Sequence, residues 1–429
     1  MDQGLLHYRN RELWWGKHAL AEVVAGRATP FFLVHEGRLR ANVRALRRGL
    51  SAAGSSVVLR YCVKTHAEPA VLDVLAREDV ELLVAHAQEA TLARECGFSL
   101  SRMAYQRPVL ETEFLRTAVP QGLMQVHLSR PEDVDTLEQV ETQAPIPVSF
   151  RIRNEAPGPW LLLTRRLGFS DDTALRTARS MLRTQRLRLR AVNLYAGTQL
   201  TSVERFRAGL ARCFRLARRL ADLGISVEEV NVGGGIPSPT LGPASPRARL
   251  RRDEGEQQDP VEALERFCAR LAEVFDEERR RAGVGPVTLA AEPGRSVVGN
   301  AVVMVTTVQA VQDRWAFLDA SRNHLGESPL AWTRMILPLR ARRESALMNL
   351  SGPTLNTMDF LDLVRRVPQL EPGDLVALHD AGAYSISRAP RYAGLNPAIH
   401  VLRDDGTVAL ARRAEDYRDL TSAMVRFHG

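Results

Sequence analysis

The sequence predicts an α/β protein in which a TIM-like (β/α)8 barrel is joined to a mostly antiparallel β domain. Strand-like and helix-like segments alternate from residue 31 to about residue 296, and about eight such units are typical of a closed parallel barrel. After residue 297 a continuous β-prone run is followed by short apolar strands between turn residues, a pattern that favours an antiparallel sheet. We therefore assign residues 31–296 to the barrel, and residues 1–30 with 297–429 to the β domain.

The expected barrel strands are short apolar segments at 31–34, 57–63, 81–84, 103–105, 124–127, 147–152, 189–195, 228–232 and 287–291. Apolar residues at spacings of three and four indicate the helices between them, as with Phe206, Leu210 and Phe214. Residues 237–260 are rich in Pro, Gly and charged residues, so we expect a long mobile surface loop there. The strands expected in the β domain lie at 297–309, 315–318, 335–339, 347–350, 375–378 and 399–402.

Composition excludes several classes of function. The net charge is +8, but the arginines are scattered without a basic stripe that interleaves aromatic residues, which argues against nucleic-acid binding. The four cysteines form no CxxC pair, so we expect neither a disulfide framework nor a metal site. No secretory signal pattern and no apolar run of ~20 residues is found, which predicts a cytoplasmic protein with no membrane partner.

Lys64 is the first candidate for catalysis. Of the 58 Lys and Arg residues only Lys17 and Lys64 are lysines, so arginine supplies the generic positive charge of this chain. A primary amine can lose its proton when desolvated and attack a carbonyl carbon as a Schiff-base nucleophile, whereas a guanidinium stays protonated. Lys64 ends an apolar strand, where barrels place their chemistry, while Lys17 lies near the terminus and is expected to be a surface charge. The alternative is a strand-end lysine whose amine only reaches solvent.

Three further segments complement an amine nucleophile. The glycine run 233–235 follows a strand and leaves backbone N–H groups open to a phosphate, although such a run also fits a simple tight turn. The segment 292–295 places a carboxylate beside an arginine, for which a local ion pair is the alternative, and 380–384 ends in a tyrosine that also fits a packed turn. A Schiff-base lysine, a phosphate cradle, an acid for a ring nitrogen and an Arg/Tyr clamp are what pyridoxal 5'-phosphate requires.

The order of these segments resembles that of the fold-type III pyridoxal-phosphate enzymes, the group of alanine racemase and of the ornithine and diaminopimelate decarboxylases. The resemblance extends from about residue 30 to residue 399 and adds the segments 194–199 and 351–354. It implies a cofactor-binding set that comprises Lys64, Arg151, Tyr195, Thr198, Gly233, Gly234, Gly235, Glu292, Gly294, Arg295 and Tyr384. In this reading Lys64 binds the cofactor covalently, Tyr195 stacks on its ring, Thr198 contacts the phosphate, and Glu292 faces the ring nitrogen.

Glu292 favours the decarboxylase branch, because alanine racemase places an arginine at the ring nitrogen. The segment 195–199 resembles decarboxylases of siderophore and antibiotic pathways, which implies natural-product biosynthesis and a substrate that is an amino acid, free or carrier-linked. The resemblance implies Lys64, Tyr195, Glu292 and His324 as catalytic residues, and a substrate-binding set of Arg322, His324, Leu355 and Asn356.

The chain departs from the family where the partner subunit usually supplies a proton-donating cysteine. Leu355 stands at that position, and a leucine cannot donate a proton. Asn356 beside it lacks the charge that would bind a distal ammonium group. Water, Tyr384 or His324 is then expected to protonate the product.

The sequence therefore predicts a decarboxylase that removes the α-carboxylate of an amino acid or an amino-acid-derived biosynthetic intermediate. Three alternatives remain: a pyridoxal-phosphate enzyme with a decarboxylative transamination or oxidation outcome, a racemase, and a non-catalytic homologue that binds a partner enzyme. The family resemblance also implies a homodimer with shared sites, in which 352–359 and 322–324 reach the site of the other subunit.

Overall fold

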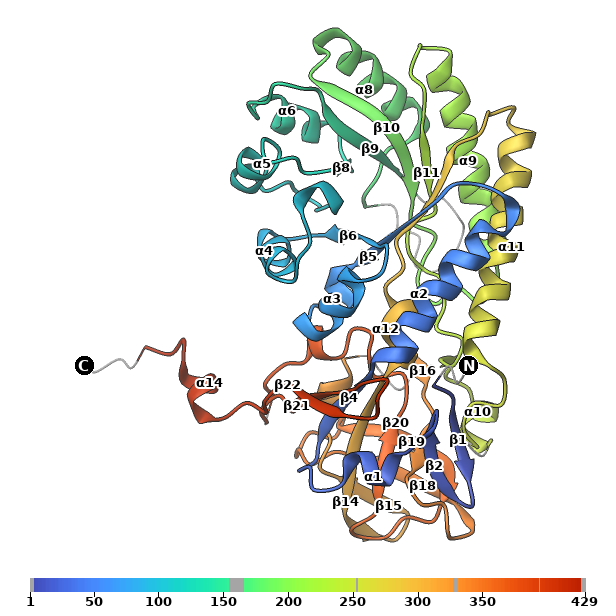
Figure 1. The fold of residues 1–429 in the computed structure, drawn as a ribbon, viewed down its shortest axis with the longest axis vertical. Helices are drawn as coiled ribbons and strands as arrows, with labels where there is room; N and C mark the ends of the chain where they lie inside the picture. The colour runs from blue at the N-terminus through green and yellow to red at the C-terminus, as the bar shows by residue number, and fades with distance from the viewer. Residues whose placement is uncertain (1–3, 154–165, 252–253, 327–330, 393, 426–429) are drawn as a thin grey trace. The chain divides into compact units, whose positions relative to one another are not determined.

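The computed structural model describes residues 4–153, 166–251, 254–326, 331–392 and 394–425, and Figure 1 shows its elements. The chain divides into two compact units. The β unit comprises residues 1–42, 238–261 and 297–429, and the barrel unit comprises residues 43–237 and 262–296.

The barrel unit contains a closed barrel whose neighbouring strands are all parallel, in the order β10-β11-β13-β5-β6-β7-β8-β9. Its strands are β5 (Val57–Cys62), β6 (Glu81–Val84), β7 (Met103–Tyr105), β8 (Gln125–Leu128), β9 (Ile146–Ile152), β10 (Leu187–Leu194), β11 (Glu229–Asn231) and β13 (Thr288–Ala291). This topology confirms the predicted (β/α)8 barrel. Its parallel strands are buried, as expected where helices cover a sheet.

Helices surround the barrel strands on the outside (Figure 1). They are α3 (Pro69–Ala76), α4 (Ala87–Glu95), α5 (Thr112–Ala118), α6 (Glu132–Glu138), α8 (Asp171–Thr184), α9 (Glu204–Ala221) and α11 (Pro260–Arg281). In α9 the buried residues Phe206, Leu210 and Phe214 recur at a spacing of four, which forms one apolar face, and arginines fill much of the rest. The Phe214 ring meets the Phe275 ring of α11 edge to face at 5.0 Å, so periodic aromatic residues pack the helical layer together.

The β unit is built on a mostly antiparallel sheet in which β14 pairs with β15, β20 and β4. The sheet comprises β4 (Phe31–His35), β14 (Val302–Gln312), β15 (Trp315–Leu318), β17 (Ile336–Pro338), β18 (Ser345–Ser351), β19 (Phe360–Pro368), β20 (Leu375–Leu378), β21 (Ala398–Leu402) and β22 (Val408–Arg412). Smaller elements of the β unit are β1 (Leu6–Arg9), β2 (Glu12–Trp15), β3 (His18–Ala19), α1 (Leu20–Val24), β12 (Gly242–Pro243), α10 (Pro246–Leu250), α13 (Arg322–Leu325), β16 (Trp332–Thr333) and α14 (Tyr417–Thr421). Helices α2 (Glu36–Leu50) and α12 (Arg295–Val298) each have residues in both units. The predicted antiparallel domain is therefore present.

One sequence prediction about this division is wrong. The strand expected to open the barrel at residue 31 is β4, which pairs antiparallel with β14 and parallel with β21 in the β unit. The segment 237–260, expected to be a long surface loop, carries the short elements β12 and α10 before the start of α11, and residues 238–261 belong to the β unit. Its Glu256 is 7% exposed and accepts hydrogen bonds from the Arg38 guanidinium at 2.7 Å and the Leu6 amide at 2.9 Å. These buried contacts hold the polar segment in place.

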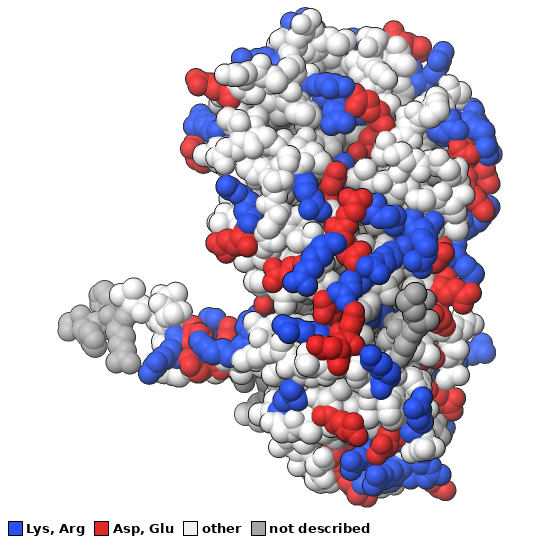
Figure 2. Space-filling model, in the orientation of Figure 1, with Lys and Arg blue, Asp and Glu red and all other residues white. Residues whose placement is uncertain are grey.

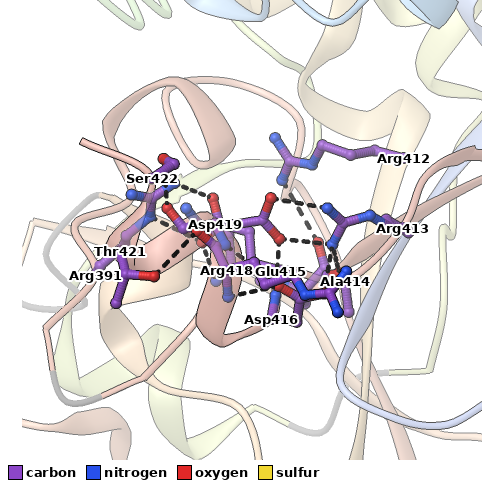
Figure 3. A network of polar contacts seen from close by, with 12 residues as sticks. Arg391, Arg412, Arg413, Ala414, Glu415, Asp416, Arg418, Asp419, Thr421 and Ser422 are labelled. Atoms are coloured by element: carbon purple, nitrogen blue, oxygen red, sulfur yellow. Dashed lines mark hydrogen bonds and ion pairs between the residues drawn. The ribbon is translucent and has the colours of Figure 1, made fainter. Parts of the chain in front are cut away.

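A polar network orders the C-terminal segment of the β unit (Figure 3). Arg391 donates two hydrogen bonds to the Glu415 carboxylate at 3.0 and 2.8 Å, and the same carboxylate accepts from the amide of Asn396. The Asp416 side chain caps α14, and Arg413 pairs with Asp419 on that helix. The short helix is thus held by charge pairs while Tyr417 stays exposed.

The charges are mixed on the face drawn in Figure 2, where basic and acidic side chains are interspersed. Within the barrel unit, Arg44 pairs with Glu78 at 2.8 Å and Arg48 pairs with Glu265 at 2.6 Å. In the described part of the chain, no helix is both long enough and apolar enough to cross a membrane.

Candidate functional site

Lys64 and Glu292 follow neighbouring barrel strands. Lys64 is exposed in a short turn (Val63–Thr65) directly after β5, and Glu292 directly follows β13. Strands β5 and β13 pair with each other, and the Cys62 amide donates to the Pro293 carbonyl at 3.1 Å. The two candidate residues therefore stand on adjacent segments at the C-terminal end of the barrel, where such barrels carry their chemistry.

Gly294 allows these two segments to approach each other closely. A Cβ built on Gly294 would lie 2.1 Å from the Thr65 Oγ1, 3.1 Å from its Cβ and 3.3 Å from its Cγ2. Thr65 is fully buried and is the residue after Lys64. Only glycine fits at position 294 in this arrangement.

The Glu292 carboxylate is buried and oriented through one of its oxygens. Oε1 accepts a 2.7 Å hydrogen bond from the Asn231 side-chain amide and lies 3.4 Å from Nε2 of His127. Burial raises the pKa of Glu292, although Arg60, the Asn231 hydrogen bond and Arg151 oppose that rise. No hydrogen bond to Oε2 is present among the described residues, so this oxygen can accept from a bound molecule.

Arg151 lies on β9, and Tyr195 directly follows the adjacent strand β10. The Arg151 guanidinium carbon lies 5.2 Å from the centre of the Tyr195 ring, within the range of a cation–π contact. Burial lowers the pKa of Arg151, while the charge of Glu292 acts in the opposite direction. The arginine therefore belongs to the same electrostatic environment as Glu292.

The glycine run packs against the segment that follows β10. Gly233 has φ +68°, and a Cβ there would lie 2.1 Å from the Leu194 carbonyl oxygen; Gly235 has φ +97° and a similar clash with Gly197. The Leu200 amide donates to the Gly235 carbonyl at 2.9 Å, so exposed Thr198 lies on a loop beside this turn.

The amide groups of the glycine run differ in availability. The Gly233 amide already donates to Asn231 Oδ1 at 2.7 Å. In contrast to the expectation from the sequence, this amide is therefore not open to a phosphate. The Gly234 and Gly235 amides make no hydrogen bond within the described residues and remain available. Arg295, at the start of α12, is buried.

The remaining predicted residues lie in the β unit, where Asp359 organises two of their segments. Its Oδ1 accepts from the Ser321 hydroxyl at 2.9 Å and the Arg322 amide at 2.8 Å, and its Oδ2 accepts from the Thr354 hydroxyl at 2.7 Å. This shared carboxylate brings the helix α13, which carries Arg322 and His324, to the loop with Leu355 and Asn356. Leu355 is fully exposed, and the Asn356 side chain accepts from the Met358 amide at 2.9 Å.

The segments that carry His324 and Tyr384 contact each other in the β unit. His324 is buried, its Nδ1 accepts from the Ser321 amide at 3.2 Å, and burial lowers its pKa. A Cβ on Gly326 would lie 1.9 Å from the Tyr384 carbonyl oxygen, and the Ser385 hydroxyl donates to the Leu325 carbonyl at 3.2 Å. The site residues thus form two groups, one in each unit.

Sequence reasoning missed several polar residues inside the barrel, namely Arg60, His127, Asn193 and Glu229. It also missed the role of Asn231 as a hydrogen-bond donor to Glu292. Arg60 donates two hydrogen bonds to Glu229 at 2.6 and 2.7 Å, and Asn193 contacts His127 at 2.6 Å. The available signal was a polar residue within a strand that was expected to be buried on both faces. No group of three or more metal-ligating side chains occurs in the described ranges.

Comparison with known proteins adds a family to this geometry. Residues 37–299, more than half of the chain, match the family model described as "Pyridoxal-dependent decarboxylase, pyridoxal binding domain". The diaminopimelate decarboxylase of Pseudomonas aeruginosa is 26% identical over 427 residues, which cover 96% of this chain and 97% of that protein. The lysine/ornithine decarboxylase of Selenomonas ruminantium is 23% identical over 394 residues, with 90% and 93% covered.

Among solved structures, diaminopimelate decarboxylase from M. jannaschii in complex with L-lysine has a TM-score of 0.85 at 20% identity, with 99% of both chains covered. At that identity the likeness concerns the fold. These relatives do not support the expected likeness to siderophore- and antibiotic-pathway decarboxylases.

Proposed function

Because the chain belongs to the family of pyridoxal-dependent decarboxylases, with pyridoxal 5'-phosphate as its cofactor, we propose that it removes the α-carboxylate of an amino acid or an amino-acid-derived biosynthetic intermediate. The observation that carries the proposal is the adjacency of Lys64 and Glu292 on paired strands at the C-terminal end of the barrel. An amine in that position suits the aldehyde group of the cofactor, and a buried carboxylate suits its pyridine nitrogen.

The residues of the barrel unit fit the cofactor. The exposed Lys64 amine can bond to its aldehyde carbon, and Glu292 Oε2 can accept the ring N–H. The free amides of Gly234 and Gly235, with Thr198 on the neighbouring loop, can bind the phosphate. When bound, the cofactor supplies an electron sink for the electron pair that carbon dioxide leaves behind.

Tyr195, Arg151 and Glu292 would set the environment of the cofactor ring. Tyr195, fixed beneath Arg151, offers an aromatic face to a planar ring, and the arginine charge favours the ionised form of Glu292. With the cofactor bound, an ionised Glu292 would hold a proton on its ring nitrogen. After carbon dioxide is lost, the site would have to deliver one proton to Cα.

We propose a homodimer in which residues 322–324 and 352–359 reach the site of the other subunit, as the family resemblance implies. The relatives named for diaminopimelate, lysine and ornithine indicate an amino-acid substrate with a second amino group. Asn356 is neutral, so the side chain at position 356 offers no carboxylate that could bind a distal ammonium group of the substrate. Carrier linkage, a natural-product pathway and a cytoplasmic location stay predictions.

The two lysines provide a direct test. Purified wild-type protein with added cofactor should develop the absorbance band of a covalently bound pyridoxal group, and Lys64→Ala should lose it. Lys17→Ala is the matched control, because it removes the other lysine outside the site and should keep the band. A wild-type protein without the band, or a Lys64→Ala protein that keeps it, refutes the proposal.

A second outcome of the same chemistry is favoured by the position of Leu355. This residue is fully exposed, and all four cysteines lie in the barrel unit, where burial raises the pKa values of Cys62 and Cys96 to about 11 and of Cys213 to about 12. Without a thiol donor, the proton could instead be delivered to the cofactor carbon. Water would then release a carbonyl product and leave the amino group on the cofactor, whereas an oxidative outcome would also consume an external oxidant such as dioxygen.

Product analysis separates the two outcomes. Mass spectrometry should detect an amine if Cα is protonated and a carbonyl compound if it is not. Leu355→Cys should raise the amine fraction of any mixture. An amine as the sole wild-type product excludes the second outcome. A racemase would release no carbon dioxide, and a non-catalytic homologue would change no substrate.

A further inference from the structure

His127 and Asn193 lie inside the barrel, directly beside the carboxylate of Glu292. His127 on β8 is fully buried, and Asn193 on β10 is 2% exposed. Strand β9 separates β8 from β10, so the 2.6 Å contact between the Asn193 amide nitrogen and His127 Nδ1 crosses the barrel interior. A buried polar pair of this kind is costly unless it is satisfied, and one end of it points at Glu292.

The contacts of the His127 ring decide which nitrogen carries its proton. Burial and the charges of Arg60 and Arg151 lower the pKa of His127 well below its usual value, so the ring holds one proton. Nδ1 accepts from the Asn193 amide, which leaves the proton on Nε2. Nε2 lies 3.4 Å from Glu292 Oε1, where a lone pair would repel the carboxylate and an N–H group attracts it.

Asn231 completes the arrangement on the same oxygen. Its amide nitrogen donates to Glu292 Oε1 at 2.7 Å, while its Oδ1 accepts from the Gly233 amide, so its orientation is set by two partners. The Asn231 amide therefore donates to Oε1, and the buried His127 Nε2, which makes no hydrogen bond within the described residues, lies 3.4 Å from the same oxygen. Oε2 keeps its capacity for a ligand. The family resemblance does not imply that Oε1 faces protein groups while Oε2 is open to a ligand.

We propose that His127, oriented by Asn193, is a positioning residue that keeps the Glu292 carboxylate charged and thereby keeps the proton on the ring nitrogen of the bound cofactor. The inference rests on the proposed function, in which Glu292 faces that nitrogen. Burial favours the neutral acid form of Glu292, so without the Nε2–H donor the carboxylate becomes more basic and takes the proton from the ring. At 3.4 Å the Nε2 group is near Oε1 without a hydrogen bond, and the contact is expected to tighten into one when the site is filled.

The test reads the ring nitrogen directly. The holoenzyme is prepared with pyridoxal phosphate that carries ¹⁵N in the ring, and its nitrogen resonance reports the protonation state. The wild type should show a protonated ring nitrogen, and His127→Phe, which keeps a ring but removes the donor, should shift the resonance toward the unprotonated position. His127→Gln restores an N–H donor and should restore the wild-type resonance in large part.

Ser149→Ala is the matched control. Ser149 is the backbone partner of His127 on β9, and its buried hydroxyl has no hydrogen-bond partner within the part of the chain that the structure describes. The control therefore alters the same barrel interior without touching Glu292, and it should leave the resonance unchanged. Asn193→Leu, which frees the tautomer of His127, should shift the resonance in the same direction as His127→Phe by a smaller amount, and it serves if His127→Phe does not fold. With a substrate in hand, His127→Phe should lower kcat about tenfold with little change in KM, as expected for a lost hydrogen bond to a charged group.

Glu292→Gln separates failure of this inference from failure of the proposed function. If Glu292→Gln leaves the nitrogen resonance unchanged, Glu292 does not face the ring and the proposed placement of the cofactor fails. If Glu292→Gln shifts the resonance but His127→Phe and Asn193→Leu match Ser149→Ala, the positioning role of His127 is overturned while the cofactor placement stands.

Discussion

Gly294→Ala is expected to disrupt the turn that carries Lys64. The added Cβ would lie 2.1 Å from the Thr65 hydroxyl oxygen, 3.1 Å from its Cβ and 3.3 Å from its Cγ2. Rotating the threonine side chain offers no relief, because every rotamer of a β-branched residue keeps two heavy atoms on the crowded Cβ. Overpacking of a buried site typically costs about 1–3 kcal/mol, and here the strain falls on the residue next to the proposed cofactor lysine.

Urea denaturation followed by circular dichroism measures this loss, and absorbance of the bound cofactor measures its effect on the site. Gly285→Ala is the control, since a Cβ there meets no atom within 4 Å. Adding Thr65→Ala to Gly294→Ala removes the two outer side-chain atoms and should recover most of the stability, which a double-mutant cycle will show as strong coupling. If Gly294→Ala denatures at the same urea concentration as Gly285→Ala, the close approach of the two segments is wrong.

Three other perturbations test charges elsewhere in the molecule. Glu229→Leu removes the two-bond partner of buried Arg60, which keeps the 2.8 Å bond from its Nε to Glu81, so the loss in urea denaturation should lie at the lower end of the range for a broken buried pair, about 3 kcal/mol; the double variant with Arg60→Met should lose much less, and equal losses would contradict a buried ion pair. Burial lowers the pKa of His379, but Asp380 and Glu256 together outweigh it and the net pKa is raised, so its stabilisation is complete below the ordinary pKa of 6.5 and is lost as pH rises through the higher folded-state pKa. His379→Gln should remove that part of the pH dependence of the denaturation midpoint, and an unchanged profile would assign it to other groups. Glu415→Gln should speed amide hydrogen exchange in α14 and leave the barrel strands unaffected; unchanged exchange would show that the network of Figure 3 does not order the helix.

Local sequence determined the barrel and its two principal site residues, Lys64 and Glu292. Alternating apolar strands and amphipathic helices specify parallel β/α units without knowledge of distant partners, because period and composition act within each segment. Lys64 was found by its rarity and its place at a strand end, and Glu292 by the same place on another strand. Both signals are local in the chain, so both could be read before the strands were paired.

Only the tertiary structure decided which partners these segments meet. Strand β4 is an apolar run of five residues that would fit either unit, and its pairing with β14 across the chain placed it in the β unit. Closure of the barrel likewise brings His127 to Asn193, 66 positions later, and Asn231 to Glu292, 61 positions later. Such contacts depend on strand order and register, which no local pattern encodes, and they set the charge and orientation of the carboxylate at the centre of the site.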